Sequence, residues 1–202
     1  MPQCVAVLLA AGGGTRFRGG SHKLLADLGG RPLWRHAFDA VCAAGFDHVV
    51  VVTGAVPLPL TPSPTTIGGT TVHEVHHDLW SEGQATSLAA GIERATSLGA
   101  EAVVVGLADQ PMITTDAWRA VASAPDDCRI VVAEYDGVPG PNPVRLAREV
   151  WPLLPRSGDE GARSLLRSHP EWVCRVACLG SADDVDTTED LHRWRSSRTN
   201  SP

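Results

Sequence analysis

Residues 4–16 read CVAVLLAAGGGTR, an apolar run followed by three consecutive glycines and an arginine. A short apolar run that is bounded by glycines predicts a β-strand. Glycines let the backbone turn back on itself and present N–H groups to an anion. Arg16 and Lys23 add positive charge beside this turn. The stretch therefore predicts a strand that leads into an anion-binding loop.

Further apolar runs alternate with helical patterns along the chain. We expect strands at 4–10, 48–53, 102–106, 129–133 and 172–177, and helices at 32–44, 84–98, 115–124, 145–154, 160–168 and 188–195. This alternation predicts a single-domain α/β fold with a mostly parallel, doubly wound (Rossmann-like) sheet. Its binding crevice is expected at the carboxyl ends of the strands.

The remaining segments are assigned by composition. Residues 56–66 contain four prolines and predict an irregular surface loop, and residues 135–143 predict a turn before an added strand or helix. We place the domain at 1–195 and a polar tail, expected to fray, at 196–202.

The overall composition limits the possible partners. Of the 202 residues, 43% are hydrophobic and 20% are charged, which is typical of a globular protein. The net charge of −6 argues against nucleic acid and anionic membranes as partners. No run approaches the roughly 20 apolar residues of a membrane span, and the first apolar run is too short for a signal peptide. A cytoplasmic location is expected.

Five cysteines are scattered along the chain, and no two have C-x-x-C spacing: Cys4, Cys42, Cys128, Cys174 and Cys178. An odd number without paired spacing predicts reduced thiols rather than a zinc site or a disulfide framework.

The glycine loop fits neither common phosphate-binding motif. A P-loop requires Gly-Lys-Ser/Thr, whereas Lys23 lies between His22 and Leu24. A dinucleotide fingerprint requires a third glycine where Phe17 stands, and a helix that begins at once. Here the first good helix start is Pro32.

The segment LAAGGGTRF…HKLLADLGGRPL instead resembles the signature of the MobA-like nucleotidyltransferases. This superfamily includes molybdenum-cofactor guanylyl- and cytidylyltransferases and sugar-phosphate nucleotidyltransferases. The resemblance implies a nucleotide-diphospho-sugar transferase type of fold. It also implies that Arg16 and Lys23 are catalytic and that the nucleotide is bound by Leu9, Ala10, Ala11, Gly12, Gly13, Gly14, Arg16 and Lys23. An ordinary glycine-rich connection is the alternative.

Two more segments resemble the cytidylyltransferase (MocA-like) branch. WSEGQATSLAAGI at 80–92 is similar to its W-x-x-G-x-x-x-S-L-x-x-G-L pattern and implies nucleotide contacts from Gly83 and from Ser87, in the first turn of a helix. LADQP at 107–111 is similar to L-x-D-Q-P. It implies that Asp109, at the end of a strand, binds the nucleotide, takes part in catalysis and holds Mg²⁺.

DVDTTEDL at 184–191 resembles D-I-D-T-P-E-D-L and implies Asp186 as a second Mg²⁺ ligand. In a strand, Asp184 and Asp186 would share a face, and whether Asp184 also binds metal stays open. The alternative is that Asp186 or Thr187 caps the last helix.

The acceptor site is expected at Asn142, Asp159 and Arg163. SGDEGAR at 157–163 resembles the G-D-x-G-A-R motif beside the acceptor site of the cytidylyl branch, although Asp159 could instead cap a helix. GPNPVR at 140–145 departs from the family's G-H-P-V-L-F, with Asn142 for His. Arg145 would then pair with a phosphorylated acceptor or lie solvated at a helix start.

The implied activity is transfer of NMP from an NTP to a phosphorylated small-molecule acceptor, with release of pyrophosphate and with Mg²⁺ as cofactor. Ala11, where guanylyl-transferring relatives carry Gly, favours CTP, and the branch implies a molybdopterin-type acceptor and a molybdoenzyme that receives the product. A GTP-dependent guanylyltransferase and a sugar-phosphate nucleotidyltransferase are the alternatives. No nucleic acid or membrane partner is expected.

Two other classes compete with this interpretation. HEVHH at 73–77 matches the zinc hydrolase motif H-E-x-x-H, but its β-branched surroundings are too short for the required helix, and the resemblance places a strand there. A catalytically dead binding module is disfavoured because Arg16, Lys23, Asp109 and Asp186 are all present.

Overall fold

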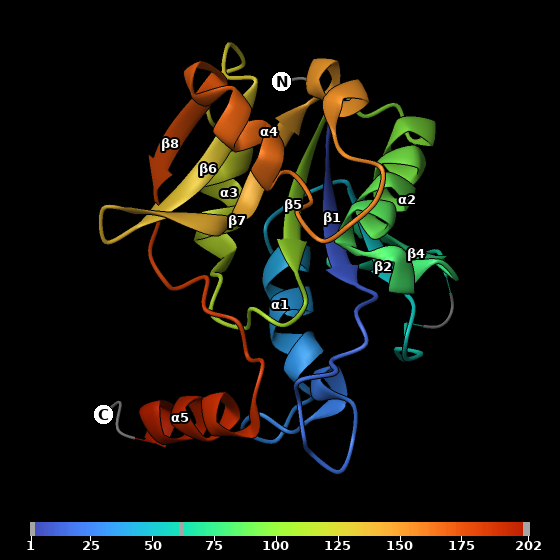
Figure 1. The fold of residues 1–202 in the computed structure, drawn as a ribbon, viewed down its shortest axis with the longest axis vertical. Helices are drawn as coiled ribbons and strands as arrows, with labels where there is room; N and C mark the ends of the chain where they lie inside the picture. The colour runs from blue at the N-terminus through green and yellow to red at the C-terminus, as the bar shows by residue number, and fades with distance from the viewer. Residues whose placement is uncertain (1–2, 61–62, 200–202) are drawn as a thin grey trace.

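The computed structural model describes residues 3–60 and 63–199, which form one twisted sheet covered by helices on both faces (Figure 1). Within these residues the sheet has eight strands in the order β3-β4-β2-β1-β5-β7-β6-β8. Their bounds are β1 Cys4–Ala10, β2 His48–Thr53, β3 Thr65–Ile67, β4 Thr70–His76, β5 Ala102–Leu107, β6 Ile130–Tyr135, β7 Val138–Ala147 and β8 Val173–Ala177.

The pairing confirms a mostly parallel, doubly wound sheet. β1 pairs in parallel with β2 and with β5, β2 with β4, and β6 with β8. β3 and β7 run antiparallel to their neighbours. In the register of the central strands, Leu9 lies beside Val52 on one side and Leu107 on the other. The carboxyl ends of β1, β2 and β5 therefore meet at one edge of the sheet.

The helices cover two faces that the alternation of β1 defines. The bounds are α1 Leu33–Cys42, α2 Gln84–Ser97, α3 Thr115–Ala122, α4 Arg163–Ser168 and α5 Thr188–Thr199, with 3₁₀ turns η1 Lys23–Leu25, η2 Trp80–Glu82, η3 Arg148–Leu153 and η4 Pro170–Trp172. Leu8 lies in a core with α1 and α3, whereas Val7 lies in a core with α2 and α4. Successive residues of a strand point to opposite faces, so one apolar run serves both cores.

A third, smaller core attaches the C-terminal segment to the region before α1. Val185 and Leu191 are buried against Ala26, Leu28 and Leu33. Figure 1 shows α5 beyond the carboxyl edge of the sheet, near the chain that precedes α1. This packing holds the residues around 184–187 at the same edge as the glycine loop. The helix continues through Thr199, past the expected start of the tail, and residues 200–202 lie outside the described part.

The predicted helix at 145–154 is wrong at its start. Residues 145–147 belong to β7, and η3 follows them. Arg145 is 4% exposed, and its guanidinium donates to the carbonyl oxygens of Ala122 and Ala124 at the end of α3. Ala122 ends α3 and Ala124 lies just past it, so no following helical turn supplies N–H donors to these carbonyls, and the buried cation satisfies them. Arg145 thus neither faces an acceptor nor lies in solvent.

Two other expectations need correction. The segment with Asp184 and Asp186 is a loop rather than a strand. Cys128 and Cys174 form a disulfide, with their Cα atoms 5.9 Å apart, so the prediction of five reduced thiols is wrong for this pair. Parallel pairing of β6 with β8 places Val131 beside Cys174 and brings Cys128, just before β6, into reach. Cys4, Cys42 and Cys178 are free.

The H-E-x-x-H match lies largely in β4. A strand places His73 and Glu74 on opposite faces, so the arrangement that a zinc hydrolase helix provides does not form. Among the described residues, no helix is both long and apolar enough to cross a membrane.

Candidate active site

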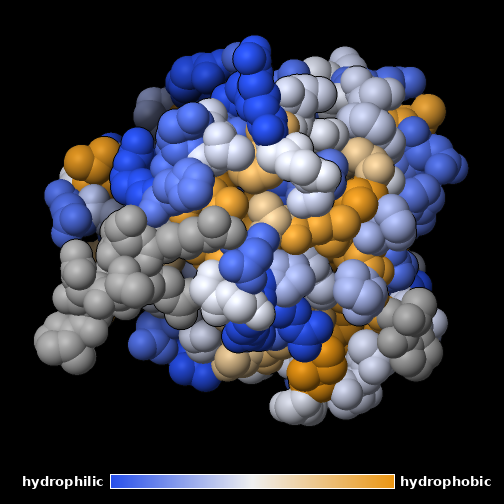
Figure 2. Space-filling model, turned by 90° about the horizontal axis from the view of Figure 1, so that it is seen from below, coloured by the Kyte–Doolittle hydropathy of each residue, from blue (hydrophilic) through white to orange (hydrophobic). Residues whose placement is uncertain are grey.

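A cleft of about 650 Å³ opens at the carboxyl ends of β1, β2 and β5. Figure 2 views the molecule from this side and shows apolar surface across the middle of the face between hydrophilic groups. The lining of the cleft includes every residue predicted to bind nucleotide or metal: Leu9, Ala10, Ala11, Gly12, Gly13, Gly14, Arg16, Lys23, Gly83, Ser87, Asp109 and Asp186. The cleft is where parallel sheets of this topology bind ligands.

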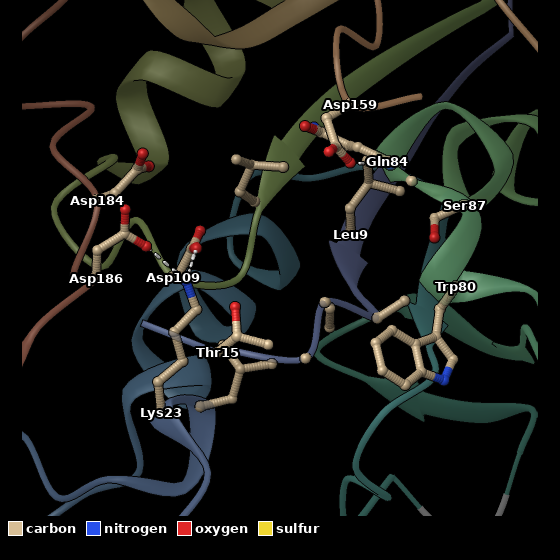
Figure 3. A pocket seen from close by; sticks show the side chains of 18 of the residues that line it. Leu9, Thr15, Lys23, Trp80, Gln84, Ser87, Asp109, Asp159, Asp184 and Asp186 are labelled. Atoms are coloured by element: carbon tan, nitrogen blue, oxygen red, sulfur yellow. Dashed lines mark hydrogen bonds and ion pairs between the residues drawn. The ribbon is translucent and has the colours of Figure 1, made fainter. Parts of the chain in front are cut away.

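Four charged side chains meet on one side of the cleft, and Figure 3 shows three of them: Lys23, Asp109 and Asp186. Lys23 Nζ lies 2.6 Å from Asp109 Oδ2 and 2.9 Å from Asp186 Oδ1. Arg16 Nη1 lies 2.7 Å from Asp186 Oδ2. Arg16 and Lys23 come from the loop after β1, Asp109 follows β5, and Asp186 follows the buried Val185. Residues up to 170 positions apart are thus brought together by the sheet edge and the third core.

Burial and charge act against each other at Lys23. Its side chain is 11% exposed. Burial lowers the pKa of the Lys23 amine, but the charge of Asp109 and the hydrogen bonds to Asp109 and Asp186 outweigh burial and raise that pKa above its ordinary value. Lys23 is therefore a stable cation throughout the physiological range.

A third carboxylate, Asp184, lies at the same place. Burial raises the pKa of the Asp184 carboxyl, and the negative charge of Asp109 raises it further. Gln110 opposes this shift, because its Nε2 donates to Asp184 Oδ1 at 2.8 Å and to the carbonyl oxygen of Ala182 at 2.8 Å. The site thus concentrates negative charge that only Lys23 and Arg16 are seen to offset among the described residues.

The carboxylates fit a divalent cation. Asp109 Oδ1 is buried and has no hydrogen-bond partner within the described structure, so one good oxygen ligand is left over. Carboxylate oxygens are the protein ligands that Mg²⁺ prefers, and it completes its shell with phosphate and water. In the described ranges, no group of three or more His, Cys, Asp or Glu side chains could hold a metal by itself. Asp109 and Asp186 therefore fit as part of a coordination shell, and their role as metal ligands stays a prediction.

Thr187, rather than Asp186, caps the last helix. Thr187 Oγ1 accepts from the Asp190 N–H at 3.1 Å, and Asp190 Oδ2 accepts from the Thr187 N–H at 3.0 Å. This reciprocal pair is a capping box at the start of α5. The Asp186 side chain is left to Lys23 and Arg16.

The predicted acceptor residues are split by the structure. Asp159 and Arg163 line the cleft, whereas Asn142 does not. Asn142 is 7% exposed, and its Nδ2 donates to Gln110 Oε1 at 3.0 Å. Asn142 therefore lies behind Gln110, which in turn holds Asp184. A role of Asn142 in acceptor binding stays a prediction.

The loop around Asp159 is bound to the start of α2. Asp159 Oδ1 accepts from the Gln84 N–H at 3.2 Å, and the Gly158 carbonyl accepts from the Ala85 N–H at 2.9 Å. Gly83 has a φ of 114°, and a Cβ there would lie 2.5 Å from the Gly158 backbone. Asp159 does cap a helix, but the helix is α2, which precedes it by 75 residues.

Several lining residues were not predicted: Thr15, Leu24, Trp80, Ser81, Gln84 and Leu107. Asp184, whose role as a metal ligand stayed open, also lines the cleft. The indole of Trp80 covers the glycine loop, because a Cβ at Gly13 would lie 2.9 Å from Trp80 Cζ3. The Trp in the W-x-x-G pattern was the available signal for this residue.

His22 also contacts the glycine loop. The Leu24 N–H donates to His22 Nδ1 at 3.3 Å, so Nε2 carries the proton and donates to the Gly12 carbonyl at 3.0 Å. Burial lowers the pKa of His22, although its bond to Gly12 opposes that shift. A neutral ring therefore fixes the turn that precedes Arg16.

Comparison with known proteins gives the family and several relatives. The family model of the MobA-like NTP transferase domain matches residues 6–173. The purine catabolism protein PucB of Bacillus subtilis (strain 168) is 31% identical over 207 residues, which cover 96% of this chain and 97% of PucB. Rv0371c from Mycobacterium tuberculosis H37Rv has a crystal structure with a TM-score of 0.78 and 28% identity, covering 96% of this chain and 98% of that chain.

Two further structures are informative. Rv0371c has also been solved in complex with manganese, with a TM-score of 0.73 and 27% identity over 96% of this chain and 99% of that chain. The inositol-1-phosphate CTP transferase from T. maritima has a TM-score of 0.71 at only 14% identity, over 97% of this chain and 96% of that chain, and thus shows the fold alone.

Proposed function

The chain belongs to the MobA-like NTP transferase family, and from this we propose that it transfers CMP from CTP to a phosphate group of a molybdopterin-type acceptor and releases pyrophosphate. The observation that carries the proposal is the cluster of Lys23, Arg16, Asp109 and Asp186 beside a glycine loop in one cleft. Phosphate-rich substrates need positive side chains, backbone N–H groups and metal-binding carboxylates together.

The proposed chemistry is one in-line displacement. An oxygen of the acceptor phosphate attacks the α-phosphorus, a new P–O bond forms, and the bond to the β-phosphate breaks with its electron pair leaving on pyrophosphate. No covalent enzyme intermediate is required, so the protein acts by positioning and by electrostatics.

Each residue of the cluster has a defined task in this proposal. The backbone of Gly12–Gly14 and the side chain of Arg16 hold the β- and γ-phosphates. Lys23 contacts the α-phosphate and stabilises the charge that develops there. Asp109 and Asp186 hold Mg²⁺, which when bound neutralises part of the triphosphate charge.

A pyrimidine base is proposed from Ala11, which lines the cleft as Trp80 does. Ala11 has a methyl group that a glycine would lack, and it is buried. The methyl group leaves less room for a base than a glycine would. A purine needs more room, which makes guanylyl transfer from GTP the second candidate.

The acceptor is proposed from the residues opposite the charge cluster. Asp159 and Arg163 line the cleft, and Figure 3 shows Asp159 beside Gln84, away from Lys23 and its carboxylates, so an acceptor can approach the α-phosphate from that side. A molybdoenzyme is proposed as the receiver of the product, and the relative PucB is named for purine catabolism. Transfer to a sugar phosphate is the alternative.

A cytoplasmic location agrees with the use of an NTP and stays a prediction. The Cys128–Cys174 disulfide is unusual for that compartment, where thiols are mostly kept reduced.

The test combines binding and turnover. Calorimetry with CTP, GTP, ATP and UTP in the presence of Mg²⁺ is followed by pyrophosphate release with molybdopterin-type and sugar-phosphate acceptors. We expect CTP to bind most tightly and turnover to require the pterin. Tighter binding of GTP overturns the base assignment, turnover only with another acceptor overturns the cofactor assignment, and no NTP binding at all overturns the reaction class.

A further inference from the structure

Lys23 is the only lysine among the 202 residues, and its ammonium lies between the two carboxylates proposed to hold the metal. It takes one oxygen of Asp109 and one of Asp186, while Arg16 takes the other oxygen of Asp186. Of the four carboxylate oxygens, only Asp109 Oδ1 has no such partner. A divalent cation can therefore take Asp109 Oδ1, but for any oxygen of Asp186 it competes with Lys23 or Arg16.

A metal that arrives alone and bridges the two carboxylates at the position of the ammonium has to displace Lys23. The lysine side chain is 11% exposed, so its displaced ammonium would remain near the carboxylates without the partners that offset its burial. The metal would also gain only two protein carboxylates, because no larger group of metal-binding side chains converges within the described ranges. The displaced ammonium and the small number of protein ligands both disfavour metal binding to the protein alone.

A triphosphate changes this balance. It brings oxygens that can accept hydrogen bonds from Lys23 and others that can complete the coordination of Mg²⁺. The stem of Lys23 already lies against the phosphate-binding loop, since a Cβ at Gly14 would lie 3.0 Å from Lys23 Cγ. Because the lysine stem is flexible, a rotation of the side chain would carry the ammonium toward phosphates held at this loop.

We propose that Lys23 is an exchangeable internal cation, which fills the metal site between Asp109 and Asp186 until a triphosphate draws it onto phosphate oxygens, so that the divalent cation binds after the nucleotide. The inference rests on the proposed function and adds an order of binding to it. It also gives Lys23 a task before the chemical step, because its charge keeps three neighbouring carboxylates together in the protein that has not yet bound nucleotide.

The first experiment measures Mn²⁺ binding without nucleotide, from the electron paramagnetic resonance signal of free Mn²⁺. Wild type is compared with Lys23→Met, which keeps most of the stem and removes the charge, and with Lys23→Arg, which keeps a charge. We expect Lys23→Met to bind Mn²⁺ about tenfold or more tightly than wild type, the size typical of one charged contact, and Lys23→Arg to bind weakly. Equal affinities of wild type and a folded Lys23→Met overturn the proposal.

CTP provides the second half of this measurement. We expect CTP to raise the Mn²⁺ affinity of wild type by a larger factor than that of Lys23→Met, because only wild type has a cation to remove. An equal increase in both proteins overturns the proposal.

The single lysine allows a test in the wild-type protein, which does not depend on whether a variant folds. Protein labelled with ¹³C-lysine gives one lysine Cε signal in an NMR spectrum. We expect CTP without metal to shift this signal, whereas Mg²⁺ at the same concentration without CTP leaves it in place. A shift of equal size with Mg²⁺ alone overturns the order of binding. If CTP binds and supports turnover but the order fails, only this inference is lost, whereas failure of any NTP to bind removes the proposed function as well.

Discussion

The side-chain amide of Asn142 donates a 3.0 Å hydrogen bond to Gln110 Oε1, and both residues are buried. The nitrogen of the same Gln110 amide donates to Asp184 Oδ1 and so holds Asp184 beside the proposed metal site. Asn142→Ala leaves Gln110 Oε1 buried without its partner. We expect the free energy of unfolding to fall by about 1–3 kcal/mol, measured by urea denaturation.

The same variant tests the acceptor role that was predicted for Asn142. If Asn142 acts only through Gln110, the KM for the acceptor changes no more than the KM for the NTP. A selective rise of the acceptor KM in a protein of unchanged stability would contradict the buried position and restore the acceptor role.

Much of the fold could be predicted because its signals are local. The apolar runs of β1 and β2 are continuous, and both strands have the predicted bounds. Glycines after β1 and the carboxylate after β5 then meet at one edge, as the topology of a parallel sheet requires. The charged cluster in the cleft could be predicted because the family resemblance covers it, whereas lining residues such as Thr15, Leu24 and Ser81 stand at variable positions of the motifs.

What could not be predicted depends on contacts between distant segments. Arg145 reads as a polar residue at a helix start, but carbonyls at the end of α3 satisfy it inside a strand. Cys128 and Cys174 are 46 residues apart, and only the pairing of β6 with β8 brings them together. Asp159 caps α2 rather than the helix that follows it. The spacing of residues along the sequence does not predict these contacts.

Gly83 is required by both its backbone angle and its neighbour. Its φ is 114°, and a Cβ would lie 2.5 Å from the Gly158 backbone, at the junction between α2 and the loop around Asp159. Gly137 is a matched control, because its φ is 79° but a Cβ there meets nothing within 4 Å. We expect Gly137→Ala to lose about 1–3 kcal/mol of unfolding free energy from the backbone strain, and Gly83→Ala to lose more. Equal losses in thermal or urea unfolding would show that the contact with Gly158 is unimportant.

His73 predicts a loss of stability in acid. It is buried between Arg94, which donates to His73 Nδ1 at 3.0 Å, and His48, whose Nδ1 lies 3.2 Å from His73 Nε2. Burial lowers the pKa of His73, followed by the charge of Arg94 and by His48. A histidine with a lowered pKa in the folded state stabilises the protein above the unfolded pKa of about 6.5, and this contribution is lost as the pH falls.

The measurement is the urea midpoint between pH 7.5 and pH 5. We expect the midpoint of wild type to fall more steeply over this range than that of His73→Gln, which cannot take up the proton. His22 has a lowered pKa as well, so it acts in the same direction in both proteins and cancels in the comparison. Parallel pH curves for the two proteins would exclude His73 as the source.

Lys23→Ala is expected to lose turnover while the protein stays folded. Removal of one preorganised charge costs about 2–4 kcal/mol of transition-state stabilisation, or about 30- to 900-fold in kcat/KM. Arg18→Ala is the control, since Arg18 is exposed on the same loop but does not line the cleft. Pyrophosphate release near the wild-type rate in the lysine variant would remove Lys23 from the mechanism.

Asp186 and Thr187 are neighbours with separate tasks, and two substitutions distinguish them. Asp186 pairs with Lys23 and Arg16 in the cleft, whereas Thr187 and Asp190 form the capping box of α5. Asp186→Asn keeps the shape but offers a poorer ligand for a hard cation, so we expect a higher Mg²⁺ concentration for half-maximal pyrophosphate release. Thr187→Ala removes the cap and is expected to lower the free energy of unfolding by about 0.5–2 kcal/mol without shifting the Mg²⁺ dependence.

Asp109→Asn should shift the Mg²⁺ dependence in the same direction as Asp186→Asn, because the two carboxylates are proposed to hold one ion. If both Asp variants titrate Mg²⁺ as wild type does, the carboxylate pair is not the metal site, and Lys23 is then simply their structural counter-ion.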